Sequence, residues 1–458
     1  MTHTGFIAAI DLGTSKISGV IGRKNENNVI SVLAYGSLPS ENSIRRGTVY
    51  NIDKAGGIVK KLINLLENKA GRKIGKVYVS LGGQSVYTEE VREILDIPAS
   101  GIVTENMTGK LLAKAKSYKP DFKTNYAVAD VEYFIDDKSE QNPVGVTGST
   151  IEAAYKVVVG RPNLLPNIKN VIEKNHLQIA GHIVSPLASA AIALDEQDKE
   201  LGCAFIDFGA GTTSLSVYKG GILRHMVVIP FGGRNITKDI AELNFVESEA
   251  EQIKNKFGKA KENTNEGFMF TSPFSSKPDV DLVELNKVIV LRLDEITANI
   301  KEQIRLSGFQ GQLGAGVIIT GGASQLKNID LYLAQKLNMQ VKRVSSRKSL
   351  VNNSPELVSD VSFTTALGML LLGDEDCEKT IVEENQKEPA AAQKSEGRGI
   401  GWGNIFQGRP KKEKEKEPPV EHKVNKKKKS EETEDSEKKS GFFGSIFTGM
   451  FEDEQDDE

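Results

Sequence analysis

Residues 8–22 read AAIDLGTSKISGVIG, and residues 204–218 read AFIDFGAGTTSLSVY. In both stretches an apolar strand ends in an aspartate, a glycine turn follows, and a second strand leads away from the turn. The pattern predicts strands over Phe6–Ile10 and Ile17–Ile21 in the first stretch. Because a motif of this length recurs, the sequence predicts an α/β protein built from two related halves around one site.

The first glycine turn carries groups that suit a phosphate. Gly13 lets the backbone approach an anion closely, and the hydroxyls of Thr14 and Ser15 join the backbone N–H groups as donors. Lys16 adds a positive charge, and Asp11 is expected to hold Mg²⁺ through water. Taken alone, these residues are also compatible with an ordinary hairpin, because short glycine motifs often occur by chance.

The second glycine turn repeats this design. Asp207 ends an apolar strand, and Gly209, Gly211, Thr212 and Thr213 follow it. A tight hairpin is again the alternative when the turn is considered alone. In two facing halves, however, the two turns would clamp a phosphate chain and its metal, held by Asp11 and Asp207, from both sides.

A third glycine turn lies within VIITGGAS at residues 317–324. An apolar strand runs into Gly321 and Gly322, Ser324 follows, and a helix is expected over Gln325–Leu337. Because a turn without side chains leaves room against the backbone, these three residues are candidates for contact with a nucleoside.

Glu251 and Lys254 lie three residues apart within the helix expected over Glu247–Phe257. This spacing places both side chains on one face, where they are candidates to hydrogen-bond ribose hydroxyls. The alternative is a solvated surface pair, which is common at this spacing.

Composition excludes several classes of protein. The 458 residues carry a net charge of −3, which argues against a nucleic-acid partner. Cys203 and Cys377 are far apart, so neither a disulfide scaffold nor a cysteine zinc site is expected. We find no apolar run long enough for a transmembrane helix and no secretory signal, and the five histidines have no metal-ligand spacing.

The three glycine turns, in this order, resemble those of the actin-like ATPases. Further strings narrow the resemblance: PLASA at residues 186–190, PFGGRNIT at 230–237 and ITGGAS at 319–324. Together they are similar to the FtsA family of bacterial cell-division proteins, over roughly residues 5–372. The resemblance implies an actin-like ATPase fold, with two ribonuclease-H-like halves around a nucleotide cleft that takes ATP and Mg²⁺. It also implies an inserted 1C subdomain of the SHS2 type.

The resemblance implies a division of the chain into subdomains. From first to last these are 1A (1–83), the inserted 1C (84–162), the return of 1A (163–202), 2A (203–231), 2B (232–308), the return of 2A and the end of the fold (309–373), a disordered charged linker (374–439), an amphipathic membrane-targeting helix (440–451) and an acidic tail (452–458).

Ser185 departs from the pattern of MreB-like relatives, in which a glutamate at this place positions the attacking water. A serine orients water poorly compared with a carboxylate. We therefore expect ATP to be bound firmly and hydrolysed slowly, as a ligand of assembly, and we assign no catalytic residue.

The end of the chain carries an apolar stripe after a polar stretch that is too poor in apolar residues to fold. At helical spacing, six side chains share one half of the helix: Phe442, Phe443, Ile446, Phe447, Met450 and Phe451. Such a stripe suits a lipid interface, although docking into a protein groove is the alternative. Residues 400–406 form a smaller apolar island that includes Trp402.

By resemblance, the protein polymerises at the cytoplasmic face of the inner membrane at the division site. Its expected partners are the C-terminal peptide of FtsZ, received on residues 232–308, further copies of itself, the membrane surface and downstream division proteins. The rival functions are a small-molecule kinase and a PilM-like pilus assembly adaptor, both of the same superfamily.

Overall fold

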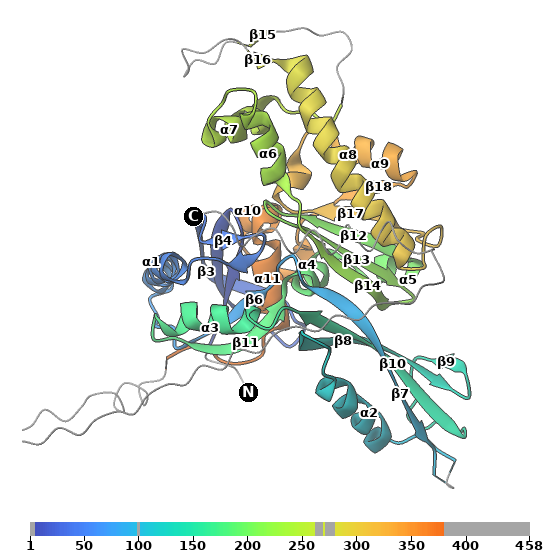
Figure 1. The fold of residues 1–458 in the computed structure, drawn as a ribbon. Helices are drawn as coiled ribbons and strands as arrows, with labels where there is room; N and C mark the ends of the chain where they lie inside the picture. The colour runs from blue at the N-terminus through green and yellow to red at the C-terminus, as the bar shows by residue number, and fades with distance from the viewer. Residues whose placement is uncertain (1–4, 99–100, 262–268, 271–279, 380–458) are drawn as a thin grey trace, which may run out of the picture. The chain divides into compact units, whose positions relative to one another are not determined.

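The structure is a computed structural model that describes residues 5–98, 101–261, 269–270 and 280–379 (Figure 1). The chain divides into two compact units, Met1–Pro389 and Ala390–Glu458, and all described residues belong to the first. No helix among the described residues has both the length and the apolar character needed to span a bilayer.

The first half is built on a five-stranded sheet in the order β11-β6-β1-β2-β3. β1 pairs antiparallel with β2 and parallel with β6. The strands are β1 (Ile7–Leu12), β2 (Lys16–Lys24), β3 (Ile30–Pro39), β6 (Lys76–Leu81) and β11 (Gln178–Val184). A separate hairpin joins β4 (Ile44–Arg45) to β5 (Thr48–Val49).

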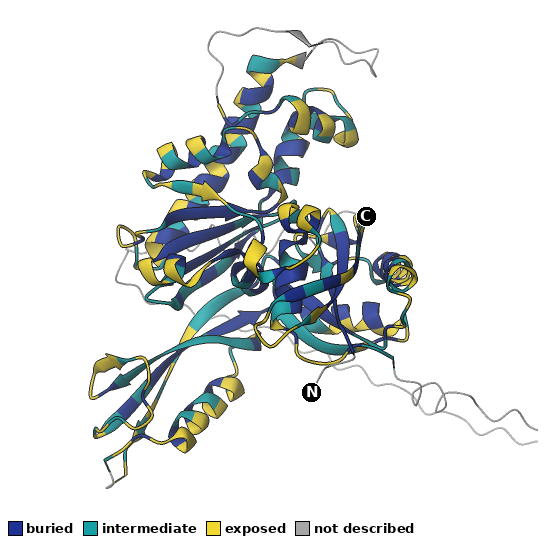
Figure 2. Ribbon diagram, turned by 180° about the vertical axis from the view of Figure 1, so that it is seen from behind, coloured by how far each residue is buried: buried dark blue, intermediate teal, exposed yellow. Residues whose placement is uncertain are grey.

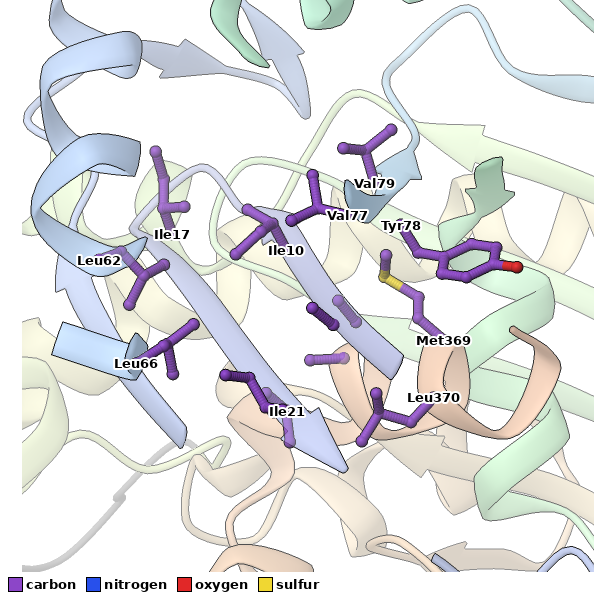
Figure 3. Close-up of a cluster of buried hydrophobic side chains, with 14 of the residues drawn as sticks. Ile10, Ile17, Ile21, Leu62, Leu66, Val77, Tyr78, Val79, Met369 and Leu370 are labelled. Atoms are coloured by element: carbon purple, nitrogen blue, oxygen red, sulfur yellow. The ribbon is translucent and has the colours of Figure 1, made fainter. Parts of the chain in front are cut away.

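Helices cover both faces of this sheet. On one face lies α1 (Ile52–Ala70), whose apolar stripe is buried. It starts at the cap Asn51 and ends at Gly71, where φ is 64°. Leu62 and Leu66 of α1 and Met369 and Leu370 of α11 (Thr364–Leu372) approach the β1–β2 strands (Figure 3). The other helices packed here are α3 (Leu164–Glu173) and α4 (Ser185–Ala193).

The second half repeats this strand order. β12 pairs antiparallel with β13 and parallel with β17, as β1 does with β2 and β6, which confirms the two related halves. The strands are β12 (Cys203–Phe208), β13 (Thr213–Lys219), β14 (Ile222–Ile229), β17 (Gly316–Thr320) and β18 (Val341–Arg343). The residues of β12 and β17 are almost all buried, whereas the helices expose their outer faces (Figure 2).

The second half also contains most of the remaining helices. The long helix α8 (Leu282–Leu306) packs on α6 and on the sheet. The other elements of this half are α5 (Glu196–Leu201), α6 (Gly233–Ala241), α7 (Glu247–Phe257), β15 (Met269–Phe270), β16 (Val280–Asp281), η1 (Gly322–Gln325) and α9 (Ile329–Leu337). By contrast, η2 (Lys348–Leu350), α10 (Pro355–Ser359) and η3 (Val361–Phe363) pack on the core of the first half.

One helix begins later than its sequence predicts. We expected a helix over Gln325–Leu337, but η1 occupies the start of this stretch and α9 begins only at Ile329. Asn328 separates the two elements in the left-handed region, with φ at 65°, so the chain turns before the helix forms.

The stretch that we expected as an insertion continues the sheet of the second half. It comprises β7 (Tyr87–Asp96), α2 (Glu105–Ser117), β8 (Thr124–Ile135), β9 (Lys138–Glu140) and β10 (Thr150–Gly160). Through a pairing of Tyr87 with Val227, β7 adds to β14, giving one nine-stranded sheet in the order β18-β17-β12-β13-β14-β7-β10-β8-β9. α2 covers one face of these added strands (Figure 1).

The ordered chain extends beyond the predicted start of the linker at residue 374. Asp374 and Glu375 donate their N–H groups to the Tyr78 hydroxyl, at 3.0 and 2.9 Å. The N–H of Cys377 donates to Phe6 O at 2.8 Å, and its side chain is buried. Residues 374–379 therefore belong to the first half, because these backbone groups find partners there. The proposed membrane helix, the 400–406 island and the acidic tail lie outside the described residues.

Candidate functional site: a cleft between the two halves

A cavity of about 810 Å³ brings the three glycine turns together. It is bordered by the β1–β2 turn, the β12–β13 turn and the turn after β17. Of the predicted site residues, those that line it are Asp11, Gly13, Thr14, Ser15, Lys16, Asp207, Gly209, Thr212, Glu251, Lys254, Gly321 and Gly322. Residues from both halves of the sequence thus meet at one site.

The two phosphate-type turns touch each other. A Cβ atom on Gly211 would lie 2.7 Å from the side chain of Thr14, so only glycine allows this approach. Gly211 does not line the cavity, and its role is to let the turns meet. The Thr14 hydroxyl accepts a hydrogen bond from the N–H of Gly47 at 3.0 Å, which attaches the β4–β5 hairpin to the first turn.

Two half-buried carboxylates face the cavity from opposite halves. Burial, and then the charge of Asp207, raise the pKa of Asp11 to about 6, against a hydrogen bond from Ser80 and the charge of Lys16. Burial also raises the pKa of Asp207, and a hydrogen bond from Ser189 opposes this. A divalent cation between them would supply the positive charge that this pair lacks, so the two aspartates fit a Mg²⁺ site.

The turn after β17 needs glycine at its first position. Gly321 has φ at 88°, and a Cβ atom there would lie 2.3 Å from Asp207 Oδ1 and 2.5 Å from Phe208 O. A side chain would therefore displace the proposed cation ligand. By contrast, a Cβ atom on Gly322 meets nothing within 4 Å, so this position faces open space in the cavity.

Two of the predicted site residues, Thr213 and Ser324, donate their hydroxyl groups to backbone carbonyl oxygens instead of lining the cavity. The Thr213 hydroxyl donates to Phe231 O at 2.8 Å, and that of Ser324 donates to Gly321 O at 2.7 Å. Both side chains are buried and neither lines the cavity. We correct their assignment from direct contact to support of the turns, because their single hydroxyl protons are already used.

Glu251 and Lys254 form an ion pair in which the lysine is buried, although the side chain of Glu251 is 45% exposed. The Lys254 ammonium donates to Gly233 O at 2.9 Å, to Thr237 Oγ1 at 2.8 Å and to Glu251 Oε2 at 2.7 Å. These contacts use its three protons, so Lys254 has none left for a ribose. Burial lowers the pKa of Lys254, against the pull of Glu251. Glu251 remains the candidate for contact with a sugar.

Several lining residues were missed by the sequence analysis. They come from the loop after β3, from η3 and α11, and from α6 and α7: Ser40, Glu41, Asn42, Gly47, Arg234, Thr237, Glu247, Ser362 and Thr365. Arg234 pairs with Glu247, which lowers the pKa of that carboxyl group. Arg234 and Thr237 lie within the PFGGRNIT string, which could have pointed to them, whereas the other missed residues carry no motif.

The serine that departs from the expected pattern does lie at the cavity. Ser185 begins α4 and lines the cavity beside Gly82, whose Cβ atom would lie 3.0 Å from its hydroxyl oxygen. The other carboxylates that line this cavity, apart from the two aspartates, are Glu41, Glu247 and Glu251. Two of these, Glu247 and Glu251, are held in ion pairs.

Two halves of one topology, with matching aspartate–glycine turns facing across a cleft, define the actin-like ATPase fold. The same fold occurs in the PilM-PilN type IV pilus biogenesis complex, with a TM-score of 0.56 and 17% identity over 81% of this chain and 98% of that chain. At this identity the likeness concerns the fold alone.

Sequence comparisons give the family. The family model described as cell division protein FtsA matches residues 204–368. The cell division protein FtsA of Porphyromonas gingivalis is 33% identical over 330 residues, which are 70% of this chain and 68% of the relative. That of Neisseria meningitidis serogroup B is 30% identical over 374 residues, or 80% and 89%. The chain belongs to the FtsA family of cell division proteins, which confirms the predicted resemblance.

Proposed function

We propose that the protein binds ATP with Mg²⁺ in the cleft and uses the nucleotide as a ligand of assembly in cell division. The observation that carries this proposal is the meeting of two half-buried aspartates and three glycine turns at one cavity of about 810 Å³. This volume lies within the usual range for small-molecule and cofactor sites.

In this proposal each turn has a role. The N–H groups of the two aspartate turns, with Thr14, Ser15, Lys16 and Thr212, bind the phosphate chain. Asp11 and Asp207 hold the cation, which would neutralise phosphate charge when it is bound. Gly209 and Gly13 keep the turns free of side chains. Gly321 and Gly322 receive the nucleoside, and Glu251 binds the ribose.

We further propose that turnover of ATP is slow. At Ser185 the cavity has a hydroxyl group where water-activating relatives are expected to carry a carboxylate, and a serine is a weak general base. A phosphate-release assay is expected to show slow turnover by the full chain alone. Rapid release without a partner would contradict this part of the proposal.

The proposed cellular role is that of a filament-forming tether. We propose that residues 440–451 insert at the inner membrane face and that subdomain 2B receives the FtsZ C-terminal peptide, with the subdomain limits given by sequence. Membership of a family of cell division proteins favours this function over a kinase or a pilus adaptor. Binding of a labelled FtsZ peptide, measured by anisotropy, tests the partner; equal binding by a scrambled peptide would oppose it.

The central test is calorimetry of ATP binding with Mg²⁺ and with EDTA. The full chain is expected to bind more tightly with Mg²⁺, and Lys16→Ala is expected to weaken binding about tenfold or more, because it removes a charged donor to phosphate. Lys54→Ala, at an exposed position outside the cavity, is the matched control. Unchanged affinity in Lys16→Ala would remove this lysine from the site, and no binding by the parent chain would refute the proposal.

A further inference from the structure

Ser189 is in direct contact with one of the two proposed cation ligands. Its hydroxyl donates to Asp207 Oδ2 at 2.8 Å and lies 2.9 Å from Thr365 Oγ1. The side chain is buried, with no exposed surface. Because the Ser189 proton goes to the carboxylate, which only accepts, Thr365 must be the donor of the second bond. The order of donation is therefore Thr365 to Ser189 to Asp207.

This short chain of hydrogen bonds crosses between the halves. Ser189 lies on α4 and Thr365 on α11, which packs on β1, β2 and β6 of the first sheet, whereas Asp207 belongs to β12 of the second. The two helices cross in close contact, since a Cβ atom on Gly368 would lie 1.9 Å from Ala188 O. Ser189 is therefore held rigidly from the first half.

The second oxygen of Asp207 is also confined. Oδ1 lies against Gly321, where a Cβ atom would come within 2.3 Å of it. A carboxylate that is hydrogen-bonded through one oxygen and packed through the other has little freedom to rotate. Asp11 differs, because its hydrogen-bonding partner Ser80 lies on β6, within its own sheet.

We propose that Ser189 is a positioning residue that orients the Asp207 carboxylate for a divalent cation from the opposite half of the cleft, with Thr365 fixing its hydroxyl. The inference rests on the proposed function. The proposal adds that the cation site is complete only when α4 lies close enough to β12 for Ser189 to reach Asp207. Cation binding then favours the arrangement of the two halves seen here. Partners that orient a ligand typically affect metal affinity strongly.

The test compares dissociation constants of ATP, by calorimetry on the full chain, in Mg²⁺ and in EDTA. Ser189→Ala is expected to weaken binding roughly tenfold in Mg²⁺ and less than about twofold in EDTA. A residue with only a packing role would weaken both equally. Ser189→Thr, which keeps the hydroxyl, is expected to restore the effect of Mg²⁺.

Ser216→Ala is the matched control. Ser216 is a buried serine of β13, it does not line the cavity, and its hydroxyl has no hydrogen-bond partner among the described residues. Removing this hydroxyl is expected to leave both constants unchanged. Thermal unfolding without nucleotide checks that each variant is folded.

A double-mutant cycle keeps the inference open to refutation. In an Asp207→Asn background, Ser189→Ala is expected to have no further effect on the Mg²⁺ dependence, since both changes act through one carboxylate. Additive effects, or equal losses in Mg²⁺ and EDTA, would overturn the inference alone. If the parent chain binds ATP with the same dissociation constant in Mg²⁺ and in EDTA, the proposed function is overturned as well.

Discussion

Asp11 shows how a binding site is maintained at a cost to stability. It is half-buried near a second carboxylate, and the pKa of its carboxyl group rises to about 6, mainly through desolvation. Near neutral pH the folded protein without nucleotide must therefore keep an ionised group that its surroundings disfavour. Such strain is typical of functional sites.

The sign of the pH dependence follows from this shift. Because the folded pKa lies above the ordinary value of 3.8, this group favours folding at low pH and that contribution is lost as pH rises through about 6. Asp11→Asn is therefore expected to stabilise the nucleotide-free protein at pH 7.5 by up to about 3 kcal/mol. The same variant is expected to lose Mg²⁺-dependent ATP binding.

Denaturant unfolding at pH 4.5 and pH 7.5 checks this prediction. The stabilisation is expected to be smaller at pH 4.5, where Asp11 is largely protonated. Asp121→Asn, at an exposed position, is the control for loss of a carboxylate. A stabilisation that does not depend on pH would show that Asp11 is not the strained group.

At the scale of elements, the α6–α7 junction shapes one wall of the cleft. Lys254 of α7 joins the start of α6, through Gly233 and Thr237, to Glu251 of its own helix. The contact between the helices is polar, and Lys254 is only 8% exposed, so its ammonium group is a buried donor to all three acceptors.

Lys254→Met is expected to destabilise the protein by about 2–4 kcal/mol, because it removes a buried ammonium group that pairs with Glu251 and donates to Gly233 and Thr237. Chemical denaturation measures this loss. Lys301→Met removes an exposed lysine of α8 and is expected to change stability by less than about 0.5 kcal/mol. Equal effects of the two substitutions would argue against the junction.

At the scale of the whole molecule, the last described residues, 374–379, are hydrogen-bonded to the first half. Residues 374–379 are bound to the first half through Tyr78, Phe6 and Gly75, and the proposed linker continues from there.

Deletion of Ser440–Glu458 is expected to abolish co-flotation of the full chain with phospholipid vesicles, because it removes the six apolar side chains of the proposed membrane helix. ATP binding and the unfolding transition are expected to remain. Deletion of Glu452–Glu458 alone keeps those side chains and is expected to preserve flotation. Continued flotation without residues 440–458 would refute the anchor.

The sequence alone determined the repeat and the chemistry of the turns. Apolar strands that end at Asp11 and Asp207 before glycine turns are local patterns, since strand and turn propensities depend on neighbouring residues. For this reason the strands around the aspartate turns were predicted correctly, and most of the predicted site residues line the cavity.

Only the tertiary structure decided which polar groups are available. Sequence does not show that the protons of Lys254, Thr213 and Ser324 are already used, or that Ser189 reaches Asp207 from the other half. Nor does it show that β7 extends the second sheet or that Cys377 packs on Phe6. Most of these contacts join different elements of the fold, and their formation depends on packing of the whole fold, not on local propensity.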